Sequence, residues 1–367
     1  TITLSVVDDS LDENCETVIV TLGSPTNASL TATSEYTYTI LDNDDAPIIA
    51  FTSASGSGGE STTSVNLPVS LSTTSGLETS VNYSVTGGTA TGNGTDYTLT
   101  SGTATIAAGE TSTNIALAIT NDTLDENDET IIVTLVDPTN SSLGANTTYT
   151  YTVNDNDEPP TVGFDSGAAS NAESVTSASI GLSISAASGL EVSIPYSVTG
   201  GTATGNGTDY TLTSGTATIA AGETSTNIAL AITNDTLDEN DETIIVTLVD
   251  PTNSSLGANT TYTYTVNDND EPPTVGFTVA SGSGSEAINA MLLQTTISEA
   301  SGKPVTVNYG IAGTATGGGV DHSLSSGEVT FQAGETSANI PIIINNDSLD
   351  EENETIIITL SDPINAT

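Results

Sequence analysis

The chain has 367 residues, and its 47 Asp and Glu residues stand against a single Lys, which gives a formal net charge of −46. Such a chain cannot neutralise phosphates, so the composition excludes nucleic-acid binding and disfavours docking on anionic lipid. Apolar residues amount to 35 %, and 34 glycines add to them, which argues against disorder despite the charge. The one cysteine, Cys15, excludes an intrachain disulfide. No apolar run approaches the ~18 residues that cross a bilayer, so we expect a soluble segment without membrane insertion.

A long internal repeat organises the chain. Residues 83–164 recur letter for letter as residues 196–277. This period exceeds the 20–50 residues of solenoid repeats, so each repeat is expected to be a domain of its own. Both chain ends fall inside a repeat, and we expect a window of a longer array, with a processed fragment as the alternative. The predicted domains are the C-terminal part of a repeat (1–45), two full repeats (46–158 and 159–271) and a repeat lacking its last strand (272–367).

The second full repeat shows strict alternation of apolar and polar residues in five segments. Alternation with a period of two predicts strands with one buried face, and no window shows a sustained helical period. Turn residues separate the segments, and about seven strands in roughly 110 residues is typical of an antiparallel β-sandwich, so we predict an all-β fold. In chain order, the predicted buried positions are Ile180, Leu182, Ile184, Ile194, Tyr196, Val198, Ile228, Leu230, Ile232, Ile244, Val246, Leu248, Tyr262, Tyr264 and Val266.

Each full repeat ends in an acidic run that is followed at once by two prolines, at residues 155–160 and again at 268–273. No Gly/Ser linker separates the repeats, and paired prolines stiffen a chain. We therefore expect tandem sandwiches in an end-to-end array with little freedom at the joints.

Carboxylates concentrate at three places in each repeat. The first is the loop 121–129, which returns at 234–242 and 346–354. The others are the Asp-Asn-Asp that closes the last strand and the single Asp96. Strand ends meet at the poles of a sandwich, and packed carboxylates repel unless a cation lies between them. Several flexible oxygen ligands favour Ca²⁺ over Mg²⁺, and solvated acidic loops are the alternative.

An ordered set of motifs points to a known family. The set comprises Gly88 to Thr91, Thr95 to Tyr97, Ser101 to Thr103, Ala108 to Thr111, Asp122 to Glu129, Val133 to Leu135 and Asp155 to Asp157. This set resembles the Calx-β domain, and the resemblance extends to the other three copies. It implies an immunoglobulin-like β-sandwich that binds several Ca²⁺ ions at one pole. The family's calcium sensors close with three consecutive aspartates, whereas the middle position here is Asn156 or Asn269, and we expect fewer ions or weaker binding there.

The resemblance also implies acidic Ca²⁺ ligands in every copy. In the first full repeat they are Glu60, Asp96, Asp122, Glu126, Glu129, Asp155 and Asp157. In the second full repeat they are Glu173, Asp209, Asp235, Glu239, Glu242, Asp268 and Asp270. The last copy offers Glu286, Asp321, Asp347, Glu351 and Glu354, and the first fragment offers Asp9, Glu13, Glu16, Asp42 and Asp44.

The acidic clusters and the single histidine are poorly suited to catalysis. Paired acids can cleave glycosides, but identical clusters repeated along the chain, with no Trp to hold a sugar, indicate metal ligands. The single histidine, His322, stands where the full repeats have Tyr97 and Tyr210, and no recurring partners equip it for catalysis or zinc binding. We therefore expect no enzyme activity.

The leading hypothesis is a structural segment of a long extracellular filament or adhesin stalk, which Ca²⁺ rigidifies at the poles between domains. Its expected partners are neighbouring copies of the repeat, other protomers in a fibre, and cell-surface or matrix ligands, and its expected location is extracellular or at the cell surface. The alternatives are a calcium-sensing regulatory module of a membrane-linked protein and a carbohydrate-binding repeat surface.

Overall fold

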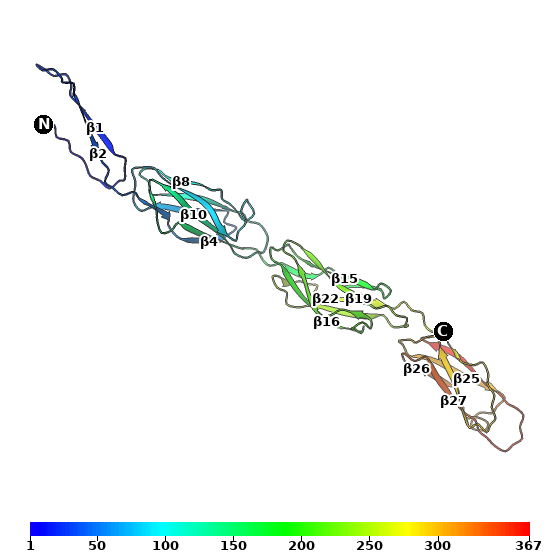
Figure 1. Cartoon of the computed structure of the whole chain (residues 1–367). Helices are drawn as coiled ribbons and strands as arrows, with labels where there is room; N and C mark the ends of the chain where they lie inside the picture. Colours follow the sequence, from blue (N-terminus) through cyan, green and yellow to red (C-terminus); the bar gives the residue numbers. More distant parts are fainter. The chain divides into compact units, whose positions relative to one another are not determined.

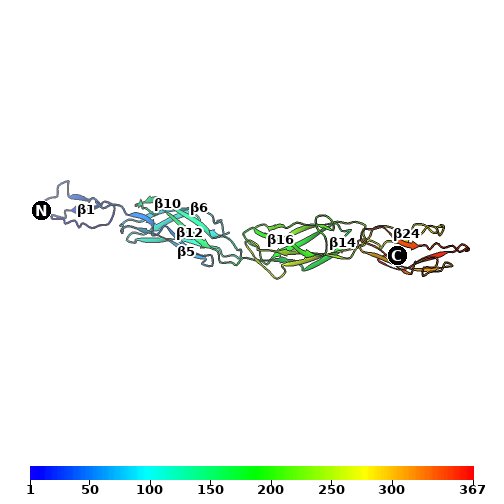
Figure 2. The same ribbon diagram turned by 90° about the horizontal axis from the view of Figure 1, so that it is seen from below.

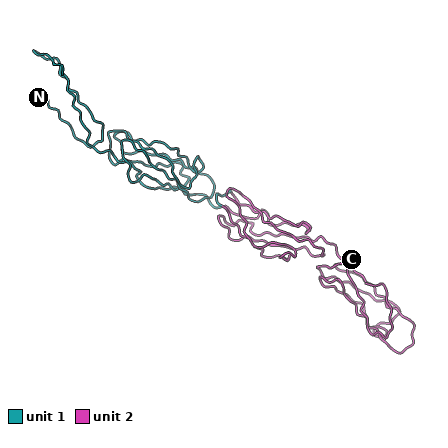
Figure 3. The backbone as a smooth tube through the Cα atoms, viewed as in Figure 1, with its two compact units in different colours: residues 1–159, 187–190 teal, residues 160–186, 191–367 magenta.

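A computed structural model describes all residues, 1–367, and the chain folds entirely into β-strands, turns and loops. It divides into two compact units, residues 1–159 with 187–190 and residues 160–186 with 191–367 (Figure 3). The structure has no helix with the length and apolar character needed to cross a membrane.

Residues 1–45 of the first unit form a small two-stranded sheet. Strands β1 (Glu16–Thr21) and β2 (Glu35–Ile40) pair antiparallel, with Glu16 opposite Ile40. Apolar side chains such as Ile19 and Tyr36 stay exposed. None of the three hydrophobic cores of the chain includes a residue of this part.

The rest of the first unit is a two-sheet sandwich. Its strands are β3 (Ile48–Phe51), β4 (Ser55–Gly59), β5 (Ser64–Leu71), β6 (Thr79–Gly88), β7 (Tyr97–Thr98), β8 (Gly102–Ile106), β9 (Ser112–Ile119), β10 (Glu129–Thr139), β11 (Ser142–Leu143) and β12 (Thr148–Asn154). One sheet has the order β11-β3-β5-β9-β7 and the other the order β4-β12-β10-β6-β8. Figure 1 labels β4, β8 and β10 of this sandwich. Two edge pairs are parallel, β11 with β3 and β4 with β12.

Alternating apolar residues close the core between these sheets. In β5 the buried residues Leu67 and Val69 alternate with polar neighbours, and β9 contributes Ile115 and Leu117 in the same way. Rings from both sheets meet in the core, because Phe51 lies 5.4 Å from Tyr149 between ring centroids. Each fully buried side chain of this size contributes about 1.5–3 kcal/mol to folding, so a core built from two sheets needs no disulfide.

The second unit begins with a repeat of the same topology. Its strands are β13 (Thr161–Phe164), β14 (Ala168–Ala172), β15 (Ser177–Ile184), β16 (Val192–Gly201), β17 (Tyr210–Thr211), β18 (Gly215–Ile219), β19 (Ser225–Ile232), β20 (Glu242–Leu248), β21 (Ser255–Leu256) and β22 (Thr261–Asn267). The sheets have the orders β17-β19-β15-β13-β21 and β14-β22-β20-β16-β18. Figures 1 and 2 label β14, β15, β16, β19 and β22 of this repeat. The same alternation therefore builds the same sandwich twice.

The last part of the second unit has two smaller sheets. Its strands are β23 (Val275–Phe277), β24 (Ala290–Ile297), β25 (Val305–Gly313), β26 (Gly327–Phe331), β27 (Ser337–Ile343) and β28 (Ile356–Ile364). The sheet orders are β23-β24-β27 and β26-β25-β28. Strand β28 pairs with β25, and the described residues end at Thr367 and include no segment equivalent to β12 or β22.

One glycine near the acidic loop is required by the backbone. Gly88 ends β6 with φ of 118°, and a Cβ there would lie 2.0 Å from the carbonyl oxygen of Thr130. Gly201 and Gly313 repeat this geometry with φ of 117° and 127°. Only glycine adopts this backbone conformation so close to a neighbouring strand. It allows the end of β6 to lie against the start of β10, the strand that follows the acidic loop.

The predicted fold class is confirmed: the chain is all-β and built of tandem sandwiches. Thirteen of the fifteen positions predicted for the second full repeat belong to its buried core, and Tyr196 and Val198 pack against that core partly buried. The alternation therefore identified the inward face of each strand correctly.

Candidate metal centre

Four segments meet at one pole of the first full repeat because of strand register. Glu129 at the start of β10 lies opposite Val153 of β12, and Asn154 at the end of β12 lies opposite Gly59 of β4. The acidic loop, the Asp-Asn-Asp after β12 and Glu60 after β4 are therefore neighbours. Tyr97 pairs with Ile119, which brings Asp96 to the same pole.

Short hydrogen bonds hold the acidic loop open toward the pole. Asp122 Oδ1 accepts from the backbone N–H of Leu124 at 2.8 Å. Asp128 Oδ1 accepts from the N–H of Asp155 at 3.1 Å and joins the loop to the end of β12. The Asp96 carboxylate accepts from the N–H of Thr91. Each of these bonds holds its carboxylate in a fixed position at the pole.

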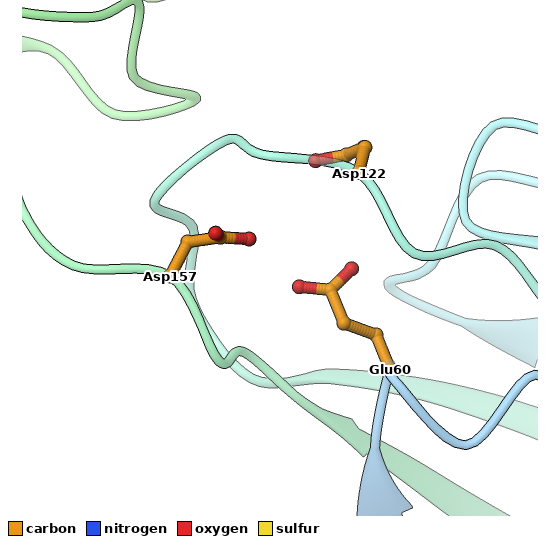
Figure 4. A group of neighbouring side chains, drawn as sticks. All are labelled: Glu60, Asp122 and Asp157. Atoms are coloured by element: carbon orange, nitrogen blue, oxygen red, sulfur yellow. The ribbon is translucent and has the colours of Figure 1, made fainter.

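Two close carboxyl groups form at this pole, and Asp122 belongs to both. Glu60, Asp122 and Asp157 form one group, in which one oxygen from each residue lies within 4.8 Å of the others. Asp96, Asp122 and Glu126 form the second group by the same criterion. Figure 4 shows Glu60, Asp122 and Asp157 pointing toward one another from three separate segments. This arrangement is suited to a cation that several carboxylate oxygens coordinate at once.

The other copies show related arrangements, which are complete only in the second full repeat. The second full repeat has the groups Glu173, Asp235, Asp270 and Asp209, Glu239, Glu242. The last repeat has one group, Glu286, Asp347 and Glu351, whose members are all exposed. In residues 1–45 the predicted ligands Asp9, Glu13, Glu16, Asp42 and Asp44 line a hollow of about 220 Å³ without forming such a group.

In the three later copies, five predicted ligands stay outside the close groups. Glu129 instead hydrogen-bonds Asp96, and Glu354 hydrogen-bonds Asp321, as two carboxyls do when they share a proton. Asp155 and Asp268 lie at the same poles and accept backbone N–H bonds from Glu126 and Glu239. The predicted acids are thus gathered at the poles, but not all converge on one point.

Several carboxyl groups at the poles have pKa values far above the ordinary range of carboxyl groups. Burial, followed by a hydrogen bond to Asp96, raises the pKa of Glu129 to about 7. Burial and a hydrogen bond to Asp270 raise the pKa of Glu173 to about 8. Glu242 repeats the first case, with burial and Asp209 raising its pKa to about 7. Charged neighbours without a cation favour the protonated form, so each pole is electrostatically strained at neutral pH.

Some carboxylate oxygens at the poles are buried without any hydrogen-bond donor. They are Asp155 Oδ1, Asp157 Oδ2, Asp268 Oδ1 and Asp270 Oδ2. Buried polar atoms are normally paired, and an unpaired one indicates a missing ion or water. No basic side chain reaches the pole of the first full repeat. A hard cation bound by oxygens satisfies these atoms and cancels the repulsion together, so the residues present fit a calcium ion.

The Calx-beta domain model matches residues 1–44, 42–157, 155–270 and 268–367. The chain belongs to the Calx-beta family. Calx-beta domains are non-catalytic modules of the calcium-binding type, and the resemblance inferred from the sequence motifs is confirmed. Where each domain begins and ends stays a prediction.

Solved structures show limited likeness to this Calx-beta chain. The crystal structure of CBD12 from CALX1.2 is 19 % identical, covers 60 % of this chain and 99 % of its own, and has a TM-score of 0.30. The apo-form Calx CBD1 domain is 21 % identical, with coverages of 31 % and 100 % and a TM-score of 0.29. A putative carbohydrate binding protein from Bacteroides ovatus ATCC 8483 is 11 % identical, with coverages of 58 % and 71 % and a TM-score of 0.28. Among curated proteins, none matches the sequence of this chain.

Sequence reasoning missed two kinds of acid in the Calx-beta loop. Asp128 and Asp241 anchor the loop to the end of the last strand through backbone N–H groups. Asp125 and Asp238 are 7 % and 4 % exposed and point away from the close groups toward a serine. All four recur in register with the predicted ligands. Their recurrence indicates that these acids have a role, but the spacing does not show which acidic side chains point into the close groups and which point away.

Proposed function

We propose that this chain is a structural segment of a long extracellular filament or adhesin stalk, and that its repeats bind Ca²⁺ at their acidic poles. The observation that carries the calcium part is the set of buried carboxylate oxygens without donors at the end of β12 and of β22. The near-identity of the two full repeats favours a structural role over a sensing one.

Named residues would hold the ions in the first full repeat. Glu60, Asp122 and Asp157 would hold one ion, and Asp96 with Glu126 would share Asp122 toward a second. A bound Ca²⁺ supplies positive charge and oxygen coordination there. The chain's own contribution is to hold the acidic loop, the end of β12 and the loop after β4 in fixed positions.

Charge explains why a structural repeat would need the metal. The chain carries a formal charge of −46, and self-repulsion of this kind destabilises a compact state. An ion that binds only the folded repeat adds its binding free energy to folding. Extracellular calcium modules work with weak sites on the order of 10⁻⁴ to 10⁻³ M, which suits loops held partly open to solvent.

The single basic residue of the chain supports a location outside the cell, where proteases are present. Lys303 is the one Lys or Arg of the chain, it precedes Pro304, and its side chain is paired with Asp238 at 2.8 Å. A trypsin-like protease therefore has no accessible site. We propose an extracellular or cell-surface location, with neighbouring repeats, other protomers and matrix ligands as partners.

The calcium part is tested by titrating the full chain with Ca²⁺ in a calorimeter. Asp122→Asn removes an oxygen charge from both close groups, and we expect it to weaken binding at two sites at once by about tenfold or more. Asp137→Asn is the matched control, because Asp137 is exposed, lies outside the poles and has φ of 49°, which Asn also adopts. Equal titrations of the two variants would contradict the assignment.

The filament part is tested by small-angle scattering of the full chain in millimolar Ca²⁺ and in excess chelator. A stalk stiffened by metal is expected to give a longer, straighter particle in Ca²⁺. An unchanged maximum dimension, together with normal Ca²⁺ binding, would leave a calcium-binding repeat without the proposed mechanical role.

A further inference from the structure

We propose that the acidic loop of each of the first three copies is also a docking surface for the Ser-Gly turn of the following repeat. The position shared by Asp12, Asp125 and Asp238 makes this contact. We further propose that docking is coupled to the metal site through the glutamate next in sequence. The docking stands on contacts between the chain's own residues, and only the coupling rests on the proposed function.

The contact is seen within the second unit between Asp238 and the turn that begins at Ser301. Ser301 Oγ donates to the backbone oxygen of Asp238 at 3.1 Å and lies 3.4 Å from its Oδ2. The N–H of Gly302 donates to the same backbone oxygen at 3.1 Å. Asp238 is 4 % exposed and Ser301 is 1 % exposed. Lys303, two residues after Ser301, places its Nζ 2.8 Å from Asp238 Oδ1, so the turn also supplies the donor that a carboxylate this buried needs.

The same contact occurs in the first unit between residues of different local sequence. Ser75 Oγ lies 3.3 Å from the backbone oxygen of Asp12 and 3.4 Å from its Oδ2. The N–H of Gly76 donates to Asp12 at 3.1 Å. In this loop Cys15 stands where the full repeats have an aspartate. The contact therefore survives a change in the loop beside it.

A third example lies inside the first unit, which includes residues 187–190. Ser188 Oγ lies 3.1 Å from both the backbone oxygen and Oδ2 of Asp125. The N–H of Gly189 donates to Asp125 at 3.1 Å. Three examples with the same donors and acceptors define the partner chemically as a turn that offers one hydroxyl and one free N–H.

The glycine of the turn lies directly against a glutamate of the metal centre. A Cβ placed on Gly302 would lie 2.4 Å from Oε1 and 2.6 Å from Cγ of Glu239. Glu239 shares a close carboxyl group with Asp209 and Glu242. Gly189 has the same relation to Glu126, at 2.4 Å from Oε1. One side chain therefore contacts both the turn and the ion site. Docking of the turn is expected to change Ca²⁺ affinity, and Ca²⁺ binding then changes docking by the same factor.

Hydrogen exchange on the full chain in chelator tests the docking without any metal. We expect the amide of Gly302 to be protected, and Ser301→Ala to speed its exchange by about tenfold, as loss of a buried hydroxyl contact does. Asp350→Ala is the control: Asp350 holds the same loop position in the last repeat and is exposed. Unchanged exchange in strand β27 shows that the variant remains folded.

A Ca²⁺ titration tests the coupling with a substitution in a different repeat from the ion. Gly302→Ala is expected to raise the Ca²⁺ midpoint of residues 159–271 by about fivefold or more, the lower end for coupled sites. Gly302 does not have a positive φ, so the new methyl acts on Glu239 and not on the backbone. Gly276→Ala is the control, because nothing lies within 4 Å of its Cβ position.

The outcomes separate the two proposals. A Gly302 amide that exchanges like a free turn overturns the docking, whatever Ca²⁺ does. Equal Ca²⁺ midpoints for Gly302→Ala and Gly276→Ala overturn the coupling. A wild-type chain that binds no Ca²⁺ overturns the proposed function and the coupling with it, whereas a protected Gly302 amide still supports the docking.

Discussion

The pole of the first full repeat and the pole of the last repeat carry matching acids in different surroundings. In the first, Glu60 is 7 % exposed, and Asp122 and Asp157 are half-buried around it. In the last, Glu286, Asp347 and Glu351 form a group of the same kind in which every member is exposed.

The two poles differ in the strands that surround the acidic loop among the residues described. In the first full repeat β12 pairs with both β10 and β4, and it delivers Asp155 and Asp157 into the pole. The residues described for the last repeat end at Thr367, just after β28, and include no segment that corresponds to β12. Burial of the carboxylates, and hence their demand for a cation, is therefore a property of the closed sandwich and not of the acidic loop alone.

Removal of Ca²⁺ is expected to produce the largest difference in thermal stability between the two kinds of repeat. An ion at 100 times its dissociation constant stabilises a folded domain by about 2.7 kcal/mol, and each full repeat has two close carboxyl groups. We expect chelator to lower the melting temperature of the full repeats strongly and that of residues 272–367 little. Hydrogen exchange of β10 and β28 during thermal unfolding measures this, and equal losses in both strands would refute the comparison.

Neutralising one glutamate sharpens the comparison further. Glu242→Gln removes a member of a close group, so Ca²⁺ affinity of the second full repeat is expected to fall about tenfold. In chelator the same variant should melt higher than wild type, because one repelling carboxyl is gone. Glu354→Gln is the matched control at the equivalent position in the last repeat, where both effects should be small. Calorimetry with and without Ca²⁺ checks the change of sign.

The pH dependence of metal-free stability is expected to follow the raised pKa values. Burial raises the pKa of Glu129 to about 7 and that of Glu173 to about 8, against an ordinary value of 4.5. Between these limits the folded state binds more protons than the unfolded chain, so stability falls as pH rises. In chelator the full repeats should be most stable near pH 4.5 and lose stability up to about pH 8. Thermal melts across this range that rise with pH would contradict the assignment.

The smallest expected effect concerns the one cation of the chain. Lys303 Nζ lies 2.8 Å from Asp238 Oδ1, whereas Leu190 stands at the equivalent place beside Asp125. Since Asp125 is buried without a cation, Lys303→Leu should lower stability of the second unit by only about 1 kcal/mol. The loss should shrink in high salt. Chemical denaturation at two ionic strengths measures it, and a loss that is independent of salt would point to packing instead.

The strands could be predicted from the sequence because burial on one face leaves a direct record in it. Ile180, Leu182 and Ile184 alternate with polar residues and all enter the core. The pole could be predicted only as a region. Asp122, Asp125 and Glu126 lie within five consecutive residues of one loop, yet Asp122 and Glu126 join a close carboxyl group while Asp125 turns to Ser188. Nothing in their spacing indicates which side chain takes which direction.

By itself the sequence determined the all-β fold, the repeat organisation, the family and the concentration of acids at strand ends, because each is written in periodicity, recurrence or composition. Only the tertiary structure decided which carboxylates are buried together, which hold protons and which bind a neighbouring turn. Those outcomes depend on the register of β12 against β10 and β4 and on contacts with residues about 60 positions away, such as Asp125 with Ser188, 63 residues apart. Local pattern carries no information on such distant pairs, because the free energy of burying a charge is set by everything that surrounds it.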